Sequence, residues 1–361
     1  MIIHSKIKDY TLIVTDNAFS VAHFQAVKHQ RRFYFIDKAL FGLYADQFKQ
    51  LIGNDFYLTI EALEDNKSYL KLADYYHALI DAGFKRQDAI VTYGGGILQD
   101  ISGFIASTIY RGVPWIFVPT TLLAQADSCI GSKTSINFAE SKNLIGTFYP
   151  PDLICVDGSF TRSLTARDFN SGLGEIIKFH LLSDPAGYDL LNKFLATQDL
   201  RLSPLFNTII SSTLAVKKSY FESDEFDTGR RNLLNYGHCF GHALEAATHF
   251  GVAHGEAVII GMGFANRISL KRGMMAEGTY HEFERLLRRF YPAFDLRNVT
   301  VESIISHMKK DKKRTTSQLT MILARRVGQF DKCDDVTEHE IHAAMESLVK
   351  DYPVNNKQGF V

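Results

Sequence analysis

Strand and helix patterns alternate over the first 150 or so residues, and this alternation constrains the fold more than any other feature of the chain. Short apolar runs typical of strands lie at residues 10–15, 32–37, 88–93 and 115–119. Residues 67–82 carry apolar side chains at helical spacing, and a second helix is expected from the glycines at 94–96 to Tyr110. Strands that alternate with helices predict an α/β fold, in which helices cover the faces of a parallel sheet.

The second half of the chain has a different pattern, in which long helical segments replace the strands. Helices are predicted over 174–182, 205–220, 235–248 and 256–272, with one late strand over 318–324. Pro150 and Pro151 mark a break near the change of pattern. The sequence therefore predicts two domains, an α/β domain over 1–158 and a mainly α-helical domain over 159–361.

The composition is that of a globular protein without a strong overall charge. Of the 361 residues 46% are hydrophobic, and 40 Lys and Arg balance 40 Asp and Glu, so no global field favours nucleic acid or a membrane. No apolar run approaches the roughly 20 residues of a membrane span, and the first residues lack the apolar core of a signal peptide. The 4 cysteines are scattered, which fits a reducing compartment. We therefore expect a cytoplasmic protein without nucleic-acid or membrane partners, in which any anion site is local.

Three histidines in one short segment are the clearest sign of chemistry. His238 and His242 are four residues apart, on one face of a helix, and His254 follows. With a carboxylate from Glu175 they can complete a zinc site, because zinc binds imidazole nitrogen and carboxylate oxygen and a catalytic zinc keeps one position open. Such histidines can also be core residues or support a ligand from behind. The spacing alone leaves open which of them bind metal.

Residues at the ends of two predicted strands are typical of a nucleotide site. Gly94, Gly95 and Gly96 end one strand and open a helix, where glycine lets a phosphate approach backbone N–H groups at the positive helix end. The same triplet also suits a tight turn, since it is not a G-x-G-x-x-G fingerprint. Asp37, at the end of an earlier strand, can accept hydrogen bonds from ribose hydroxyls or can act as a cap.

Cations and amides gather in several segments. Residues 133–137 and 141–144 supply two lysines and two amides, and further cations are Lys217, Lys218, Arg231, Lys312 and Lys313. Each can be solvated surface charge, but together they favour an anionic substrate that carries a phosphate. Glu175 and Lys178, three residues apart on a predicted helix, can be a solvent-exposed ion pair, although their chain neighbours are apolar.

In their order along the chain, these residues resemble the sugar phosphate cyclases, and most closely the 3-dehydroquinate synthases. The resemblance runs from about Phe33 to about Gly328. Its main blocks are 94–100, 110–113, 118–128, 131–137, 142–148, 175–178, 231–242, 254–256 and 311–313. The chain departs from the family pattern at Gln99, Ser132, His180 and Asp227. The resemblance implies a Rossmann-like NAD domain followed by a helical domain that binds metal and substrate.

The resemblance also assigns residues to ligands. The metal, zinc or cobalt in the family, would be bound by Glu175, His238 and His254. NAD would contact Asp37, Glu64, Lys67, Gly94, Gly95, Gly96, Asp100, Thr120, Thr121 and Lys142. The substrate phosphate would meet Lys133, Asn143, one of Lys312 and Lys313, and Arg111 from the second subunit of a homodimer. The rest of the pocket would be lined by Asp127, Lys178, Lys217, Arg231, Asn235 and His242.

The activity implied by the resemblance is conversion of 3-deoxy-D-arabino-heptulosonate 7-phosphate into 3-dehydroquinate and phosphate. The steps would be transient oxidation by NAD, phosphate elimination, re-reduction and an intramolecular aldol reaction. The presence of Arg231 favours this substrate, because the carboxylate of the heptulosonate needs a cation to bind it.

Three alternatives remain open. A sibling cyclase, similar to 2-epi-5-epi-valiolone synthase or 2-deoxy-scyllo-inosose synthase, would act on sedoheptulose 7-phosphate or glucose 6-phosphate. A metal-dependent polyol dehydrogenase is disfavoured by the phosphate-directed residues Arg111, Lys133 and Asn143. A non-catalytic binding protein is disfavoured by the presence of all three metal ligands.

Overall fold

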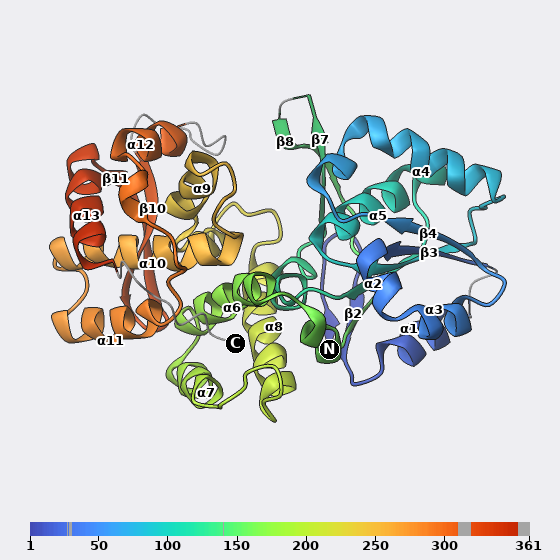
Figure 1. The fold of residues 1–361 in the computed structure, drawn as a ribbon, viewed down its shortest axis with the longest axis horizontal. Helices are drawn as coiled ribbons and strands as arrows, with labels where there is room; N and C mark the ends of the chain where they lie inside the picture. The colour runs from blue at the N-terminus through green and yellow to red at the C-terminus, as the bar shows by residue number, and fades with distance from the viewer. Residues whose placement is uncertain (27, 29–30, 140, 310–318, 353–361) are drawn as a thin grey trace. The chain divides into compact units, whose positions relative to one another are not determined.

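The computed structural model describes residues 1–26, 28, 31–139, 141–309 and 319–352, which form two compact units (Figure 1). The N-terminal unit is Met1–Ser163 and the C-terminal unit is Leu164–Val361. Lys312 and Lys313, both predicted to bind phosphate, lie outside the described residues. Within the described part of the chain, no helix is long and apolar enough to cross a membrane.

The N-terminal unit is built on a seven-stranded sheet with the order β1-β2-β9-β6-β5-β3-β4. Its strands are β1 (Ile2–Ile3), β2 (Tyr10–Val14), β3 (Arg32–Asp37), β4 (Phe56–Ile60), β5 (Ala89–Gly94), β6 (Trp115–Pro119) and β9 (Leu153–Val156). The pair β1–β2 is antiparallel and the other neighbours are parallel. β5, β6 and β9 are buried along their whole length, as expected for apolar runs in a parallel sheet. The predicted α/β fold with a mainly parallel sheet is confirmed.

Helices cover both faces of this sheet, because side chains alternate between the faces along each strand. The helices are α1 (Ala18–Ala26), α2 (Lys38–Leu43), α3 (Ala45–Ile52), α4 (Tyr69–Asp81) and α5 (Gly96–Thr108). Tyr34 and Ile36 of β3 join one apolar cluster with side chains from α1, α2 and α3. Their neighbour Phe35 points to the other face, where it contacts Tyr75 of α4; α5 packs beside α4 and against β5.

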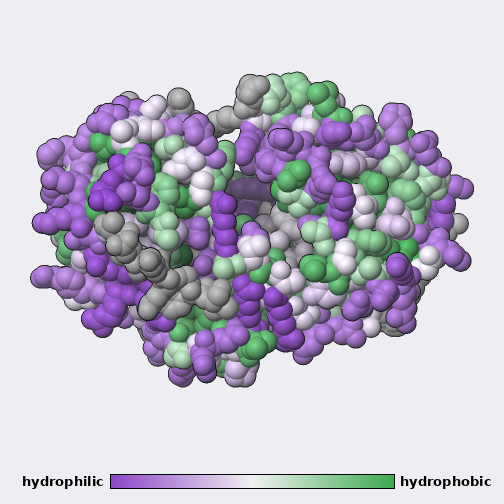
Figure 2. Space-filling model, viewed as in Figure 1, coloured by the Kyte–Doolittle hydropathy of each residue, from purple (hydrophilic) through white to green (hydrophobic). Residues whose placement is uncertain are grey.

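A β-hairpin in this unit carries several predicted site residues. Its strands β7 (Lys133–Phe138) and β8 (Ser141–Phe148) pair in antiparallel fashion. Phe138 and Leu144 are exposed, and Phe138 packs against the ring of Tyr69. Figure 2 shows the green, apolar surface at this hairpin. The hairpin therefore presents apolar side chains to its surroundings.

The C-terminal unit is mainly α-helical. Its helices are α6 (Ala166–Leu181), α7 (Pro185–Leu195), α8 (Phe206–Ser223), α9 (His238–Ala247), α10 (His254–Lys271), α11 (Glu277–Arg288), α12 (Val301–Lys309) and α13 (Glu338–Asp351). Residues 257–269 of α10 are all buried, because this helix packs against α6, α9, α11, α13 and β10. The predicted late strand is β10 (Leu319–Arg326), whose partner β11 (Gln329–Val336) the sequence pattern did not predict.

Candidate metal centre and polar network

Glycines bring three helices of the C-terminal unit into close contact. A Cβ atom at Gly255 would lie 1.7 Å from the carbonyl oxygen of Ser171, and one at Gly174 would lie 2.3 Å from the carbonyl oxygen of Gly255. A Cβ atom at Gly261 would lie 2.0 Å from the carbonyl oxygen of Gly237. Backbones this close require glycine. Each predicted metal ligand is the chain neighbour of one of these glycines: Glu175, His238 and His254.

The three predicted ligands converge at distances that fit a tetrahedral metal. Glu175 Oε1 lies 3.5 Å from His238 Nε2 and 3.4 Å from His254 Nε2. Ligand atoms at about 2.1 Å from a tetrahedral zinc are about 3.4 Å from one another. His242 belongs to the same cluster, since ring nitrogens of the three histidines lie within 4.8 Å of one another. The geometry therefore suits a metal held by Glu175 and two or three histidines.

Burial and charge give this cluster unusual pKa values. Burial favours protonated Glu175, but the Lys178 ammonium and the nearby histidines hold the pKa of this carboxyl well below its usual range. Burial and then Lys178 lower the pKa of His238. Burial also disfavours charged His254, but hydrogen bonds to Glu175 and Glu245 outweigh it and raise the pKa to about 10. A metal would find Glu175 and His238 in their binding forms and would displace a proton from His254.

Neighbouring groups fix the rings of two of these histidines. His254 Nδ1 donates to Glu245 Oε2 at 3.1 Å, and His238 Nδ1 donates to the carbonyl oxygen of Tyr236 at 3.2 Å. In both rings Nε2 is the atom near Glu175. A carboxylate behind a metal-binding histidine orients the ring and raises its basicity. Sequence reasoning missed Glu245, although its place seven residues after His238, on the same face of α9, was a usable signal.

Two lysines predicted to line the substrate pocket are buried. Lys178 forms an ion pair with Glu175, and the two side chains are 2% and 0% exposed, so the interpretation as a solvent-exposed pair is wrong. Lys217 is 5% exposed. The ammonium groups of Lys178 and Lys217 lie 4.6 Å and 6.0 Å from the centre of the Phe179 ring. The charge of Lys178 is balanced by Glu175, and both lysines lie beside the same aromatic ring.

Asp224 shapes the loop that presents Arg231. Its carboxylate accepts hydrogen bonds from the backbone N–H groups of Thr228, Gly229 and Arg231 at 2.7–3.0 Å. Burial works against these bonds, but they lower the pKa of Asp224 to about 2. Arg231 itself is buried, and one of its five N–H donors is bonded to the carbonyl oxygen of Glu225. Asn235 lies half-buried at the end of the same 3-10 helix, η5 (Arg230–Asn235).

The glycines at 94–96 form a tight turn from β5 into α5. A Cβ atom at Gly95 would lie 2.9 Å from the side chain of Thr121, so the turn needs glycine for close packing. The backbone N–H of Thr120 donates to the carbonyl oxygen of Gly94 at 3.0 Å. Two segments predicted to contact NAD are therefore side by side at the N-terminus of α5, which is the positive end of a helix.

Asp37 lies at the end of β3 and caps α2. Its Oδ1 accepts hydrogen bonds from the backbone N–H groups of Ala39 and Leu40 at 2.8 Å and 3.3 Å. The interpretation as a cap is therefore confirmed. Its predicted contact with NAD is compatible with this role, because a carboxylate accepts several hydrogen bonds.

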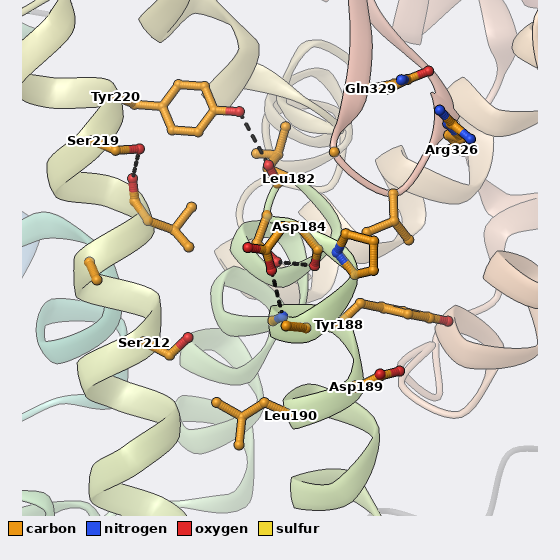
Figure 3. A pocket seen from close by; sticks show the side chains of 18 of the residues that line it. Leu182, Asp184, Tyr188, Asp189, Leu190, Ser212, Ser219, Tyr220, Arg326 and Gln329 are labelled. Carbon is orange, nitrogen blue, oxygen red and sulfur yellow. Dashed lines mark hydrogen bonds between the residues drawn. The ribbon is translucent and has the colours of Figure 1, made fainter.

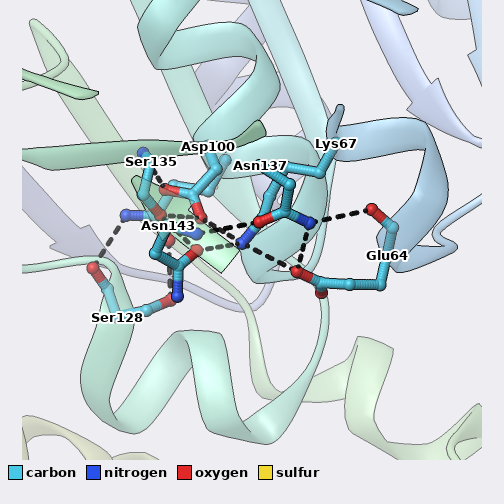
Figure 4. A network of polar contacts seen from close by, with 8 residues as sticks. Glu64, Lys67, Asp100, Ser128, Ser135, Asn137 and Asn143 are labelled. Atoms are coloured by element: carbon cyan, nitrogen blue, oxygen red, sulfur yellow. Dashed lines mark hydrogen bonds and ion pairs between the residues drawn. The ribbon is translucent and has the colours of Figure 1, made fainter. Parts of the chain in front are cut away.

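A polar network in the N-terminal unit joins residues assigned to two different ligands (Figure 4). Lys67 is buried; its Nζ donates to Asp100 at 3.0 Å and to Asn143 at 2.7 Å, and lies 3.4 Å from Glu64. Asp100 also accepts hydrogen bonds from the backbone and the hydroxyl of Ser135. Burial raises the pKa of Asp100 against the opposing effects of Lys67 and Ser135. Of the three predicted NAD residues in this network, Lys67 therefore contacts Asn143, a predicted phosphate residue, directly.

The other predicted residues of this unit lie nearer the surface. Lys133, Lys142 and Arg111 are exposed, and Asp127 is half-buried. Sequence reasoning assigned no ligand to Ser135, and it counted the amide of Asn137 only among the groups that favour an anionic substrate; both residues lie in a block that carries the resemblance.

Two residues that depart from the family pattern, Gln99 and His180, form hydrogen bonds inside the protein. His180 lies beside a residue that lines a pocket. Gln99 exchanges two hydrogen bonds with Ser128, at 2.7 Å and 2.6 Å. His180 is buried and lies 3.2 Å from the hydroxyl of Ser212. Ser212 lines a pocket of about 1090 Å³ formed by α7, α8, α11 and the β10–β11 turn (Figure 3). The described lining residues of this pocket do not include Glu175 or the three clustered histidines.

Comparisons with known proteins agree with the resemblance. The family described as 3-dehydroquinate synthase N-terminal matches residues 57–171, and 3-dehydroquinate synthase C-terminal matches residues 172–314. A 3-dehydroquinate synthase of Streptococcus pyogenes is 31% identical over 96% of this chain and 98% of its own length. One of Endomicrobium trichonymphae is 36% identical over 91% of this chain and 93% of its own. A structure of 2-epi-5-epi-valiolone synthase from Streptomyces hygroscopicus subsp. jinggangensis, with NAD+ and Zn2+ bound, gives a TM-score of 0.85 at 28% identity and covers 96% of this chain and 98% of that one.

Proposed function

The chain belongs to the 3-dehydroquinate synthase family, and we propose that it converts 3-deoxy-D-arabino-heptulosonate 7-phosphate into 3-dehydroquinate and phosphate. Relatives with this name match the chain over nearly its whole length, which supports the activity. The solved neighbour with NAD+ and Zn2+ supports NAD and zinc, or the related ion cobalt, as cofactors. The observation that carries the proposal is the cluster of buried Glu175 with half-buried His238 and His254, whose spacing suits zinc.

In the proposed reaction, the residues of this chain bind and orient the substrate. When bound, the metal polarises a substrate hydroxyl and NAD accepts and returns a hydride. Lys178 keeps Glu175 charged for the metal, and His242 faces the substrate. Arg231 binds the substrate carboxylate with Lys217 and Asn235 nearby, and Asp127 completes the pocket. The phosphate is held by Lys133, Asn143, one of Lys312 and Lys313, and Arg111.

A sibling cyclase activity is the second candidate, because the neighbour with the TM-score of 0.85 is a 2-epi-5-epi-valiolone synthase. Such an enzyme would act on sedoheptulose 7-phosphate, which has no carboxylate for Arg231 to bind. The two candidates therefore differ in what Arg231 does.

A turnover assay with each sugar phosphate in turn separates the two candidate activities. Purified protein with NAD and zinc is offered the heptulosonate, sedoheptulose 7-phosphate and glucose 6-phosphate, and phosphate release and product mass are followed. We expect turnover of the heptulosonate, and a loss of kcat/KM of about 10- to 100-fold in Arg231→Met, because a hydrogen bond to a charged group is worth about 1.5–3 kcal/mol. Turnover of only a sugar without a carboxylate would refute the first candidate and support the second. Net NADH accumulation with a polyol would instead indicate a dehydrogenase.

We also propose that the protein is a cytoplasmic homodimer in which Arg111 acts across the interface. The exposed position of Arg111 and the apolar side chains on the β7–β8 hairpin support an interface in this unit. Arg111→Ala and His254→Ala are each expected to be inactive, and subunits mixed by unfolding and refolding should regain activity, because one site of each mixed dimer is intact. A mixture without any activity would contradict the placement of Arg111.

A further inference from the structure

The carboxamide of Asn137, in β7, lies between Glu64 and Asn143, and joins the two ligand sets of the N-terminal unit (Figure 4). We infer that Asn137 is a positioning residue that couples dinucleotide binding to phosphate binding. The inference rests on the proposed function, which assigns Glu64 to NAD and Asn143 to the substrate phosphate. Asn137 itself touches neither ligand in this scheme and acts through these two partners.

The orientation of the Asn137 amide is set by its partners. Its Nδ2 donates to Glu64 Oε1 at 2.8 Å and to the carbonyl oxygen of Glu64 at 3.3 Å. Its Oδ1 accepts the backbone N–H of Asn143 at 2.9 Å. A flipped amide would face oxygen with oxygen at one end and N–H with N–H at the other, so only one orientation satisfies both. The Asn137 backbone also forms a bridge with Ser68, next to the segment that holds Glu64 and Lys67.

Asn143 is held at its backbone by Asn137 and at its side chain by Lys67 and Ser135. Its φ is 53°, in the left-handed region that asparagine adopts more readily than most residues other than glycine, and Asn137 accepts its backbone N–H. Its Oδ1 accepts a hydrogen bond from Lys67 at 2.7 Å and lies 2.9 Å from the hydroxyl of Ser135. In Figure 4 the amide nitrogen of Asn143 points away from Lys67. Asn143 is therefore held as a donor, which is what a phosphate oxygen needs.

Glu64 is held as a charged acceptor at the other end. Partial burial favours its protonated form, but the bond from Asn137 and then the charges of Lys67 and Lys142 keep its pKa below the usual value. A hydroxyl of NAD that donates to the Glu64 carboxylate would stabilise the side-chain position in which Glu64 accepts the hydrogen bond from Asn137. The ordering of Glu64, Asn137 and Asn143 is then shared between the two ligands, so the first ligand to bind lowers the ordering cost for the second.

Such coupling must be reciprocal. NAD should tighten phosphate binding, and phosphate should tighten NAD binding by the same factor. A coupling of about 5-fold is at the lower end of the usual range, and we expect at least that.

The test measures dissociation constants for inorganic phosphate, by phosphorus NMR titration of the zinc-loaded protein, with and without saturating NAD. Asn137→Ala removes both ends of the bridge. Asn137→Asp keeps an acceptor for Asn143 but places a second carboxylate against Glu64. Asn66→Ala is the matched control: Asn66 lies in the same segment as Glu64 and Lys67, and its side chain donates to the carbonyl oxygen of Glu61.

We expect NAD to lower the phosphate dissociation constant about 5-fold in the wild type and in Asn66→Ala, and to change it less than about 2-fold in both Asn137 variants. Retention of the wild-type factor in either Asn137 variant would overturn the inference. Equal loss of the factor in Asn66→Ala would also overturn it, because the effect would then be general softening of the segment. A wild type that binds both ligands without mutual effect overturns the inference and leaves the proposed function intact. A wild type that binds neither ligand refutes both.

Discussion

Replacement of Gly255 by alanine tests whether close helix packing builds the metal cluster. The added Cβ would lie 1.7 Å from the carbonyl oxygen of Ser171. Carbon–oxygen contacts between helices are about 3.3 Å, so α6 and α10 would have to separate by about 1.5 Å. Overpacking costs about 1–3 kcal/mol. Because the obstacle is backbone rather than the end of a flexible side chain, we expect Gly255→Ala to lose about 3 kcal/mol of unfolding free energy, the upper end of that range.

The same displacement should weaken zinc binding. His254 precedes Gly255, and its Nε2 lies 3.4 Å from Glu175 Oε1. Metal–ligand distances tolerate changes of about 0.2 Å, far less than the required shift. We therefore expect zinc affinity to fall by at least about 10-fold, the smallest effect typical of a disturbed ligand shell.

Gly278→Ala is the matched control for this substitution. Gly278 lies near the start of α11, and an added Cβ there meets nothing within 4 Å. Alanine is the better helix former, so this variant should gain about 0.5 kcal/mol and keep its zinc affinity. Urea unfolding of the metal-free proteins and competition with a zinc chelator measure both quantities. Wild-type stability and zinc affinity in Gly255→Ala would refute the reasoning.

Two further substitutions test charged groups. Glu245→Gln removes the carboxylate to which His254 donates, and we expect about 10-fold weaker zinc binding with little change in stability; unchanged affinity in a zinc titration would contradict this. Glu340→Gln tests the pair with Arg272, whose hydrogen bonds lower the pKa of Glu340 from 4.5 to about 2. The stabilisation is then complete above pH 4.5 and is lost as the pH falls towards 2. Urea unfolding should show a wild-type advantage of about 2 kcal/mol near pH 6 that shrinks over this window, and a constant difference would argue against it.

The central sheet could be predicted because each of its main strands contains a short apolar run that is visible in the local sequence. β3 and β6 begin and end at the predicted residues, since each is a largely apolar run. β11 was missed because its sequence, Gln329–Val336, is largely polar and only its last residue is buried. Its strand conformation comes from pairing with β10, a contact that no local pattern reports. The strands of the β7–β8 hairpin were not predicted either, and they too are defined by pairing with each other.

The metal candidates could be predicted for a related reason. His238 and His242 are four residues apart on one helix, so their shared face is a local property. Residue chemistry offered Glu175 as a possible carboxylate ligand, and the family resemblance assigned it, because its approach to the histidines depends on packing between helices. The supporting residues Glu245 and Asn137 were not predicted, because each is defined by partners that only the folded chain brings together.

The glycines next to the proposed ligands affect both the free energy of unfolding and the zinc affinity. Substitutions at different positions can separate these two effects. Gly174 and Gly255 let α6 and α10 touch, and that contact also sets the distance from Glu175 to His254. A side chain at either glycine should therefore change the unfolding free energy and zinc affinity together. Glu245 acts on the ring of His254 without setting the distance between helices, so its substitution should change affinity alone. If both kinds of substitution changed both quantities in the same proportion, the loss of zinc would be a consequence of unfolding, and the proposed role of the helix contact would fail.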